Sequence, residues 1–430
     1  MVDRVSSPCQ DRRDSPESPG ITSTDGDASS VATAEVPRAY PFGDTIGLAP
    51  HPAYAALREG PPIRVRLPYG EPCWLATGHE DVRTVLTDQR FSVAEAMSRD
   101  HPRMRPLARR GGGMVAMDPP EQTRLRQVVS RRFAARRVER MGDYIREVAE
   151  EQLAVLLAAP QPADFVALFA TPLAIRVSCD LLGLPEDGRR QFSDWARTVL
   201  SFTATDEEVA GRTVAFRGYV ADLAERRRAE PCDDLLTDLV QARDAGRIHE
   251  GELFAIAAEL LNAGFESTAC QLSSICYLLA VRPEVSALLR GRPELIPGAV
   301  EEMLRFIPLI LGSTLPRYAT EDIVLGSTLI RAGSPVLVDL AAANRDGRVF
   351  AEPDTFSLEA AESTEAPRHL AFGAGPHYCL GAQLARQELR IALELMVTRL
   401  PELRLAVPRE RVPWRTGSLL AGPEELPVAW

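Results

Sequence analysis

The segment 372–381 restricts this chain more than any other, and it reads Phe-Gly-Ala-Gly-Pro-His-Tyr-Cys-Leu-Gly. Its glycines and proline predict a tight loop dominated by backbone, with Cys379 at the start of an apolar helix. The free N–H groups at a helix N-terminus stabilise a thiolate, so the pattern favours a reactive or metal-binding sulfur. A buried structural cysteine is the plainer alternative. A zinc pair of His377 and Cys379 is disfavoured, because no second ligand pair stands nearby.

A second unusual group lies in the longest helical pattern, residues 252–279, where the run 263–268 reads Ala-Gly-Phe-Glu-Ser-Thr. An acid beside hydroxyl residues is unexpected inside an apolar helix, and Gly264 permits close approach by a planar ligand. The alternative to a ligand site is a helix whose polar face and glycine serve only to pack against other parts of the protein. A third pattern is Glu302 and Arg305, which are three residues apart and share one helix face. If the pair were exposed, it would contribute little to the stability of the protein.

Helical periodicity dominates the middle of the chain, and short alternating patterns flank it. Helices are expected over residues 81–86, 137–158, 163–182, 189–203, 207–228, 233–245 and 380–400. A hairpin is expected over 62–77, strands over 323–329 and 336–340, and an irregular, lid-like loop over 93–113. Residues 1–38 are poor in large apolar side chains and predict a disordered tail before a single folded domain, 39–430. The fold class is therefore mainly α with a minor β component.

Charge and cysteine content exclude several classes of protein. The net charge of −11 argues against a general nucleic-acid binder. Seven scattered cysteines without a Cys-x-x-Cys pair do not resemble a disulfide framework, and they favour a reducing cytoplasm. No N-terminal apolar run resembles a signal peptide or membrane anchor.

Together these motifs, in this order, resemble the cytochrome P-450 superfamily in its soluble bacterial form. The resemblance covers almost the whole chain after the tail. It implies a triangular domain that encloses haem b between the long central helix and the C-terminal cysteine-bearing helix, with the Cys379 thiolate as the iron ligand. It also implies a monooxygenase that receives electrons from NAD(P)H through an external reductase and ferredoxin, since no flavin or nicotinamide domain is fused to the chain.

The resemblance assigns roles to particular side chains. Glu266 takes the acid position and Ser267 the alcohol position of the oxygen-activating motif, with Thr268 as a possible contributor. Glu302 and Arg305 become a buried pair that supports the cysteine loop. The residues expected to contact haem, besides Cys379, are Gln122, Arg126, Ala263, Gly264, Arg317, His369, Phe372, Gly373, His377 and Gly381.

Three positions depart from the family's usual pattern. Ser267 stands where threonine is usual, Gln122 where histidine is frequent, and Ala360 where an arginine normally completes the Glu302–Arg305 pair. Arg368 is the nearest substitute for that arginine. A haem-free relative that acts as a non-catalytic partner of another biosynthetic enzyme is therefore kept as the alternative function. A peroxide-driven enzyme is disfavoured by Glu266.

The resemblance also places a substrate cavity and a partner surface. Residues 93–113, Asn262, 309–314 and 417–420 would line the cavity, and Ile310, Leu311, Leu419 and Leu420 suggest a hydrophobic small molecule, such as an intermediate of bacterial secondary metabolism. A basic patch near the cysteine would dock an acidic ferredoxin. Its expected members are Arg131, Arg132, Arg136, Arg137, Arg386 and Arg390.

Overall fold

The computed structural model describes residues 36–43, 47–106, 113–310, 315–358 and 368–430. Residues 1–35 of the expected tail lie outside these ranges, as does Ala360. The folded unit begins at Pro37, and its first strand is already formed at Arg38.

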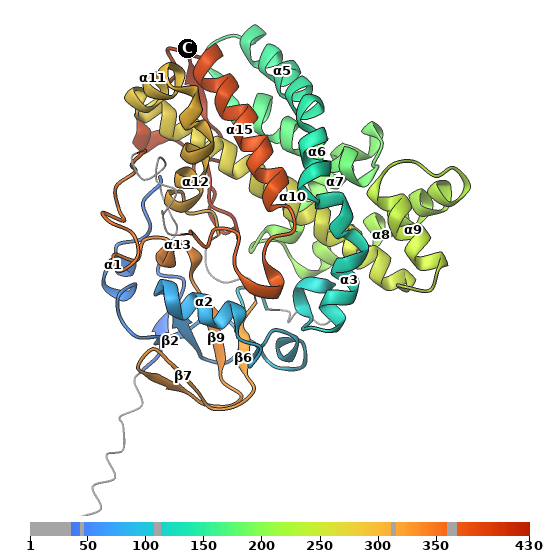
Figure 1. Cartoon of the computed structure of the whole chain (residues 1–430), viewed down its shortest axis with the longest axis vertical. Helices are drawn as coiled ribbons and strands as arrows, with labels where there is room; N and C mark the ends of the chain where they lie inside the picture. The colour runs from blue at the N-terminus through green and yellow to red at the C-terminus, as the bar shows by residue number, and fades with distance from the viewer. Residues whose placement is uncertain (1–35, 44–46, 107–112, 311–314, 359–367) are drawn as a thin grey trace, which may run out of the picture. The chain divides into compact units, whose positions relative to one another are not determined.

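Helices make up most of the described chain (Figure 1). Their bounds are α1 Ala53–Leu57, α2 His79–Thr87, α3 Glu121–Val129, α4 Ala135–Arg140, α5 Gly142–Ala158, α6 Thr171–Leu182, α7 Arg189–Leu200, α8 Asp206–Ala229, α9 Leu235–Asp244, α10 Glu250–Val281, α11 Pro283–Gly291, α12 Ile296–Phe306, α13 Leu340–Ala343 and α15 Ala382–Arg399. The strands are β1 Arg38–Ala39, β2 Ile63–Arg66, β3 Cys73–Ala76, β4 Phe91–Ser92, β5 Ala163–Asp164, β6 Arg317–Ala319, β7 Ile323–Leu325, β8 Thr328–Ile330, β9 Pro335–Val338, β10 Arg404–Leu405 and β11 Pro427–Ala429. The predicted class, mainly α with a minor β component, is confirmed.

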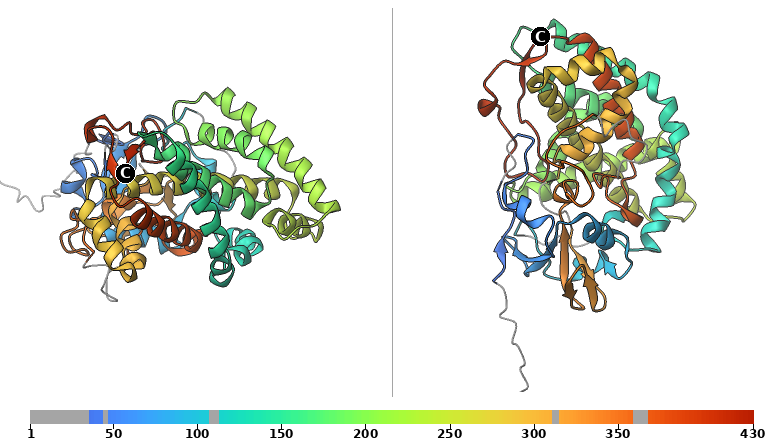
Figure 2. Two further views of the ribbon diagram at one scale, coloured as in Figure 1. Left: turned by 90° about the horizontal axis from the view of Figure 1, so that it is seen from above. Right: turned by 60° about the vertical axis from the view of Figure 1, so that its left-hand side comes forward.

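The strands form a six-stranded sheet in the order β1-β2-β3-β9-β6-β4, a three-stranded sheet β10-β11-β5 and the hairpin β7-β8. The predicted hairpin over 62–77 is the antiparallel pair β2 and β3, with Val65 opposite Cys73. β9 joins β3 in parallel and β6 antiparallel, so segments far apart in sequence meet in one sheet. This sheet lies with α1 and α2 beside the larger group of helices (Figure 2).

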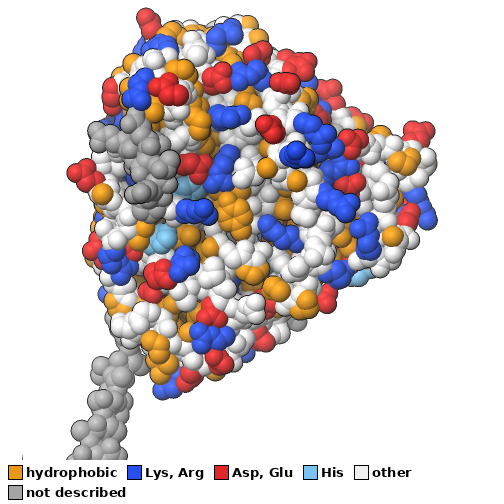
Figure 3. Space-filling model, viewed as in Figure 1, with side chains coloured by type: hydrophobic (Ala, Val, Ile, Leu, Met, Phe, Trp, Pro, Cys, Tyr) orange, Lys and Arg blue, Asp and Glu red, His pale blue; other side chains and the backbone are white. Residues whose placement is uncertain are grey.

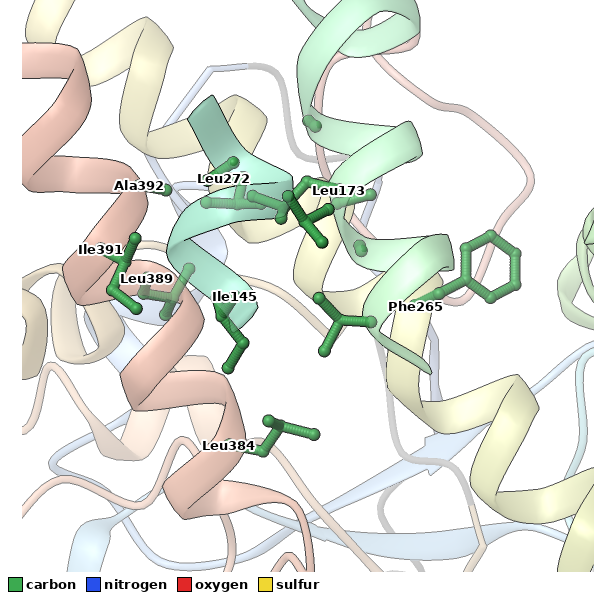
Figure 4. Packing of buried hydrophobic residues seen from close by; sticks show 14 of the residues in the cluster. Ile145, Leu173, Phe265, Leu272, Leu384, Leu389, Ile391 and Ala392 are labelled. Atoms are coloured by element: carbon green, nitrogen blue, oxygen red, sulfur yellow. The ribbon is translucent and has the colours of Figure 1, made fainter. Parts of the chain in front are cut away.

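The main core is built where α5, α6, α10 and α15 pack against one another. Figure 4 shows Ile145, Leu173, Leu272 and Leu389 from these four helices directed toward one another. Phe265 is fully buried and contacts the Phe192 ring of α7 at 5.1 Å between centroids. Burying each of these apolar side chains stabilises the fold by about 1.5–3 kcal/mol, and this packing fixes the position of α10 relative to α15.

Helix α10 is the central element, and its 32 residues span about 48 Å. His249 and Glu252 cap its first turn by exchanging hydrogen bonds with each other's backbone N–H. It ends before Pro283, where α11 begins. Within the described ranges no single helix is both long and apolar enough to cross a membrane. Only α10 and α11 taken together pass that test, and they bend by 99° at their junction.

Three predicted elements differ from the structure. The expected helix 163–182 begins with strand β5, which pairs with β11 near the C-terminus, and becomes α-helical only at Thr171. The expected strand 323–329 is the β7-β8 hairpin, which turns at Gly326 with φ +59°. The helix predicted over 137–158 is interrupted between α4 and α5.

Candidate active site around Cys379

Cys379 lies in a loop fixed by its own backbone. Its N–H donates to the Phe372 carbonyl at 2.9 Å, and the Gly373 N–H donates to Leu370 at 2.8 Å. Gly375 has φ +68°, and a Cβ there would lie 2.4 Å from the Leu86 carbonyl oxygen, so only glycine fits. Helix α15 begins at Ala382, which places the cysteine in the loop just before the helix.

The Cys379 side chain is accessible, unlike Cys73, Cys179, Cys270 and Cys276, which are buried. Burial of its surroundings raises the pKa of the Cys379 thiol, while the Gly381 N–H and the charges of Arg126 and Arg386 act in the opposite direction. The balance is a raised pKa of the free thiol, and a bound metal ion would take the place of its proton.

Beside the cysteine the structure gathers basic and polar side chains around His377. The Nε2 atom of His377 is buried and has no hydrogen-bond partner among the residues that the structure describes. Burial and the charges of Arg317 and Arg126 lower the pKa of His377 to about 4, against the opposing charge of Asp118. Burial also lowers the pKa of Arg317 to about 10, with Asp118 offsetting part of the effect. An anion placed among these groups would relieve their mutual repulsion.

Two residues that the resemblance assigned to haem contact the loop on either side of His377. The Gln122 side-chain amide donates to the Pro376 carbonyl at 2.8 Å, and Gln122 is 2% exposed. Arg126 donates to the Tyr378 carbonyl at 2.7 Å. Helix α3 therefore holds the loop from one side through residues that the sequence had assigned to the cofactor.

His369, another residue expected to contact haem, is hydrogen-bonded on the other side of the loop. Its Nε2 atom lies 3.2 Å from the Glu301 carboxylate, and its ring faces Phe372. Glu301 also accepts two hydrogen bonds from Arg386, at 2.7 and 2.8 Å. These contacts tie α12, α15 and the segment before Phe372 together, and the haem contact of His369 stays a prediction.

The residues present fit a large planar anionic cofactor ligated by sulfur. An added Cβ at Gly373 or Gly381 would meet nothing within 4 Å, so both glycines border open space beside Cys379. The accessible sulfur, the unpartnered His377 nitrogen and the destabilised Arg317 cation provide a ligand and anion contacts. Haem b, with its iron and propionates, matches this donor set.

On α10, Ala263 is exposed while Leu261 and Phe265 on either side are buried, so one face of the helix is open. Ser267 lies one turn later on that face, half-buried, and donates to the Ala263 carbonyl at 2.6 Å. Thr268 is buried and donates to the Gly264 carbonyl at 2.8 Å. Of the two hydroxyls, the accessible one is that of Ser267.

Glu266 is 1% exposed and points away from that face. One carboxylate oxygen accepts from Arg197 Nε at 3.0 Å, and the other accepts from Arg415 Nη1 at 2.5 Å. The buried charge is thus balanced by two cations from distant parts of the chain.

Glu302 and Arg305 form the buried pair that the motif predicted. They are 5% and 7% exposed, and two hydrogen bonds of 2.7 Å join the guanidinium to the carboxylate. The remaining Arg305 donors reach the carbonyls of Asn344, Pro353 and Thr355, at 2.9–3.1 Å. All five N–H groups of Arg305 are therefore used.

The pair connects to the cysteine loop through Asn344, whose side-chain oxygen accepts from the Leu370 N–H at 2.6 Å. The expected substitute, Arg368, is exposed, whereas Glu302 and Arg305 are buried. Among the described residues, its carbonyl contacts the His79 ring at 3.0 Å.

Sequence reasoning missed Arg197, Arg415 and Glu301. Each is a charged residue in a stretch of sequence typical of an exposed surface. Arg197 and Arg415 are 69 and 149 residues from Glu266, and Glu301 is 68 and 85 residues from its partners His369 and Arg386. No local spacing signals such pairs. The buried acid in the run 263–268 was the available hint that cations had to be supplied from elsewhere.

Comparison with known proteins agrees with this geometry. The Cytochrome P450 family model matches residues 293–416. The chain is 50% identical over 396 residues to the nocardicin C N-oxygenase of Nocardia uniformis subsp. tsuyamanensis, covering 91% of this chain and 98% of that one. It is 47% identical over 401 residues to the mycinamicin IV hydroxylase/epoxidase of Micromonospora griseorubida, covering 93% and 100%.

Among solved structures, the crystal structure of HinD with NMFT and NO superposes with a TM-score of 0.87 at 47% identity, over 92% of this chain and 100% of that one. Identity at this level over nearly the full length of both chains shows common descent. The chain therefore belongs to the cytochrome P450 family, as a haem-dependent monooxygenase.

Proposed function

We propose that this protein oxidises a hydrophobic small molecule in bacterial secondary metabolism, with Cys379 as the iron ligand. The observation that carries the assignment of the ligand is the accessible sulfur in a loop whose backbone is fixed by Gly375 and by the Cys379–Phe372 hydrogen bond. Around this loop, Arg317 from β6, Arg126 from α3 and His377 are the proposed contacts of the haem carboxylates. Gly373 and Gly381 leave room beside the sulfur.

Bound haem supplies reductive activation of O2, in which two electrons and two protons leave one oxygen atom in the product and one in water. The chain's part is to supply those protons and keep bulk water out. Ser267 is the proposed hydroxyl on the open face of α10, and Glu266 is the proposed buried acid next to it. Thr268 is proposed to support the helix, because its hydroxyl is buried against Gly264.

The proposed substrate face combines α10 with loops that the structure ties together. Ile310 and Leu420 form a β-bridge, and the Ala421 N–H donates to the Leu309 carbonyl at 2.8 Å. Asn262 has a buried side-chain oxygen that no described residue contacts by a hydrogen bond, so it is a candidate to bind a polar group of the substrate. Leu311 and the rest of 311–314 lie outside the described residues, as do 107–112 of the expected lid.

The named activities of similar proteins include N-oxygenation, hydroxylation with epoxidation, and biaryl coupling. We propose one of these classes of oxidation for this chain. The test is a panel of peptide, macrolide and aromatic metabolites, scored first by the change in haem absorbance on binding and then by oxygenated product. A panel in which apolar ligands cause no spectral change would reject a hydrophobic substrate.

A basic surface beside the cysteine loop is the proposed docking site of the electron donor. Figure 3 shows Arg side chains spread over the face where α15 and α3 lie, around exposed apolar side chains. Arg131, Arg136 and Arg390 are exposed, and an acidic ferredoxin is the proposed partner.

Three expected members of this patch are already paired with acids. Arg132 is 8% exposed and bound to Asp238 at 2.5 Å, so its expected role in docking is corrected to a structural one. Arg137 donates to Asp233 at 2.6 Å, and Arg386 is held by Glu301. Free cysteines throughout the described chain support the proposed cytoplasmic location.

The alternative function, a haem-free partner of another enzyme, makes an opposite prediction about the purified protein. A folded chain that contains no haem after expression with a haem precursor would support that alternative. The satisfied Glu302–Arg305 pair argues against it, because the support of the cysteine loop is intact even though Ala360 stands where arginine is usual.

A further inference from the structure

Asp118 is an acid that two neutral donors hold at the base of the predicted lid, residues 93–113. One carboxylate oxygen accepts from the Ser92 hydroxyl at 2.5 Å, and the other accepts from the Val93 N–H at 2.9 Å. The Ser92 hydroxyl in turn accepts from the Glu95 N–H at 3.1 Å. Neither donor carries a charge, so these contacts fix the carboxylate in place without neutralising it.

The six-stranded sheet places this acid at the end of β6 that carries Arg317. Ser92 of β4 lies opposite Tyr318 of β6, and the same antiparallel register brings Val93 to the level of Arg317. Arg317 is 9% exposed. Burial lowers the pKa of Arg317 to about 10, and among the described residues Asp118 is the charged group that opposes this effect. The register and the charges therefore place Asp118 beside the pocket that Arg317 lines.

The backbone of Asp118 also connects it to the cysteine loop. Its carbonyl accepts from the Gln122 N–H at 3.0 Å, and the Gln122 side chain donates to the Pro376 carbonyl. The same helix, α3, carries Arg126, which donates to the Tyr378 carbonyl. Asp118 is therefore held in a fixed position relative to both arginines that are proposed to bind the haem carboxylates.

The charges of this pocket are unequal once haem is bound. The two proposed arginine contacts, Arg126 and Arg317, balance the two carboxylates of haem. Asp118 then remains as an additional negative charge next to the same pocket. Reduction adds one more negative charge to the cofactor, and a fixed negative charge nearby makes that addition less favourable.

We propose that Asp118 is a positioning residue that holds a negative charge beside the haem carboxylates and so lowers the reduction potential of bound haem. This inference rests on the proposed function, in which Cys379 binds the iron. The step concerned is the transfer of one electron: the donor is oxidised, ferric iron becomes ferrous, and no covalent bond or proton is transferred. Asp118 acts on this step through its charge.

The test is a spectroelectrochemical titration of the haem-loaded protein, without ferredoxin or substrate, in which absorbance reports the ferric and ferrous forms at each potential. Asp118→Asn removes the charge but keeps the size of the side chain and an oxygen that accepts from the Val93 N–H. We expect its midpoint potential to rise, with an equilibrium constant for reduction about threefold or more above that of wild type. Ser92→Ala removes the hydroxyl contact and keeps the charge, so its midpoint potential should change less.

The matched control is Glu121→Gln, which removes an acid three residues further along the chain. Glu121 is 65% exposed and paired with Arg124 at 3.1 Å, so solvent and its partner already screen its charge. We expect its midpoint potential to equal that of wild type. If Asp118→Asn does not retain haem, Asp118→Ser supplies a second neutral side chain whose hydroxyl can accept from the Val93 N–H, and a rise in the midpoint potential is again expected.

A haem-loaded Asp118→Asn protein with the midpoint potential of wild type would overturn the inference. An equal rise in Ser92→Ala would also overturn it, because the cause would then be displacement of the base of the lid and not loss of the charge. A rise of the same size in Glu121→Gln would remove the special role of Asp118. A failure of the proposed function is seen separately, because wild type would then lack the carbon monoxide band of thiolate-ligated haem before any potential is measured.

Discussion

Replacing Glu302 with alanine removes the carboxylate that neutralises a nearly buried guanidinium. Arg305 then loses its two hydrogen bonds of 2.7 Å to the carboxylate. It keeps its hydrogen bonds to three backbone carbonyls, but no negative charge neutralises its guanidinium. Breaking one side of a buried pair costs about 3–5 kcal/mol. Since a domain is stable by about 5–15 kcal/mol, we expect the loss to be at least about a fifth of the total.

The assay is urea unfolding of the haem-loaded protein followed by circular dichroism, with the free energy of unfolding compared between variants at matched slopes. The chain offers a matched control in Glu80 and Arg83, which have the same three-residue spacing and the same 2.7 Å contact but are 68% and 52% exposed. Glu80→Ala should cost about 1 kcal/mol or less. The double variant Glu302→Leu with Arg305→Met should cost less than the two single losses added.

The result that would refute this reasoning is a Glu302→Ala cost equal to that of Glu80→Ala. It would mean that the backbone carbonyls alone satisfy Arg305, and that the pair does not stabilise the segment next to the cysteine loop. If Glu302→Ala loses much stability but still binds haem, the Glu302–Arg305 pair stabilises the fold and is not needed for haem binding.

Three other predictions follow from single contacts. Ser267→Ala should raise peroxide release per NADPH several-fold while Thr268→Ala changes it less, because the first hydroxyl is accessible and the second is buried against α10. Arg131→Gln should lower the association rate with ferredoxin, most strongly at low salt, whereas Arg132→Gln should lower the unfolding midpoint, as stopped-flow and urea titration would show. Glu301 is buried enough to raise its carboxyl pKa, yet its hydrogen-bonded cationic partners lower that pKa from 4.5 to about 2. The stability that the ionised Glu301 carboxylate contributes is therefore complete above about pH 4.5 and is lost as the pH falls toward 2. The difference in unfolding free energy between wild type and Glu301→Gln should narrow in acid. A difference that stays constant with pH would contradict the stabilising role of the ionised carboxylate.

The elements that sequence predicted best are those with many consecutive periodic residues. Helix α10 was expected at 252–279 and runs from Glu250 to Val281, since its apolar face is long and its end is set by Pro283. Helix α11 and helix α3 had no such prediction, because they are short and carry mixed charge. Strand β5 was missed because its pairing partner, β11, is more than 260 residues away, and local propensity cannot register that contact.

The residues of the candidate site also differ in whether a local sequence pattern predicts them. Cys379, Glu266 and the Glu302–Arg305 pair could be predicted because their neighbours in sequence are part of the motif. The contact of His369 with Glu301 could not be predicted, since it depends on how α12 and α15 pack. The arginines that neutralise Glu266 come from α7 and from the C-terminal segment, and only the folded chain brings them together.

The most direct test of the account is the absorbance spectrum of the reduced protein under carbon monoxide, compared between wild type, Cys379→Ser and Cys232→Ser. Cys232 is a free, exposed cysteine on the α8–α9 connection and serves as the matched control. We expect wild type and Cys232→Ser to show a strongly red-shifted Soret band and Cys379→Ser to lose it. A red-shifted band that survives in Cys379→Ser, or a folded wild type without haem, would contradict the assignment of Cys379 as the iron ligand.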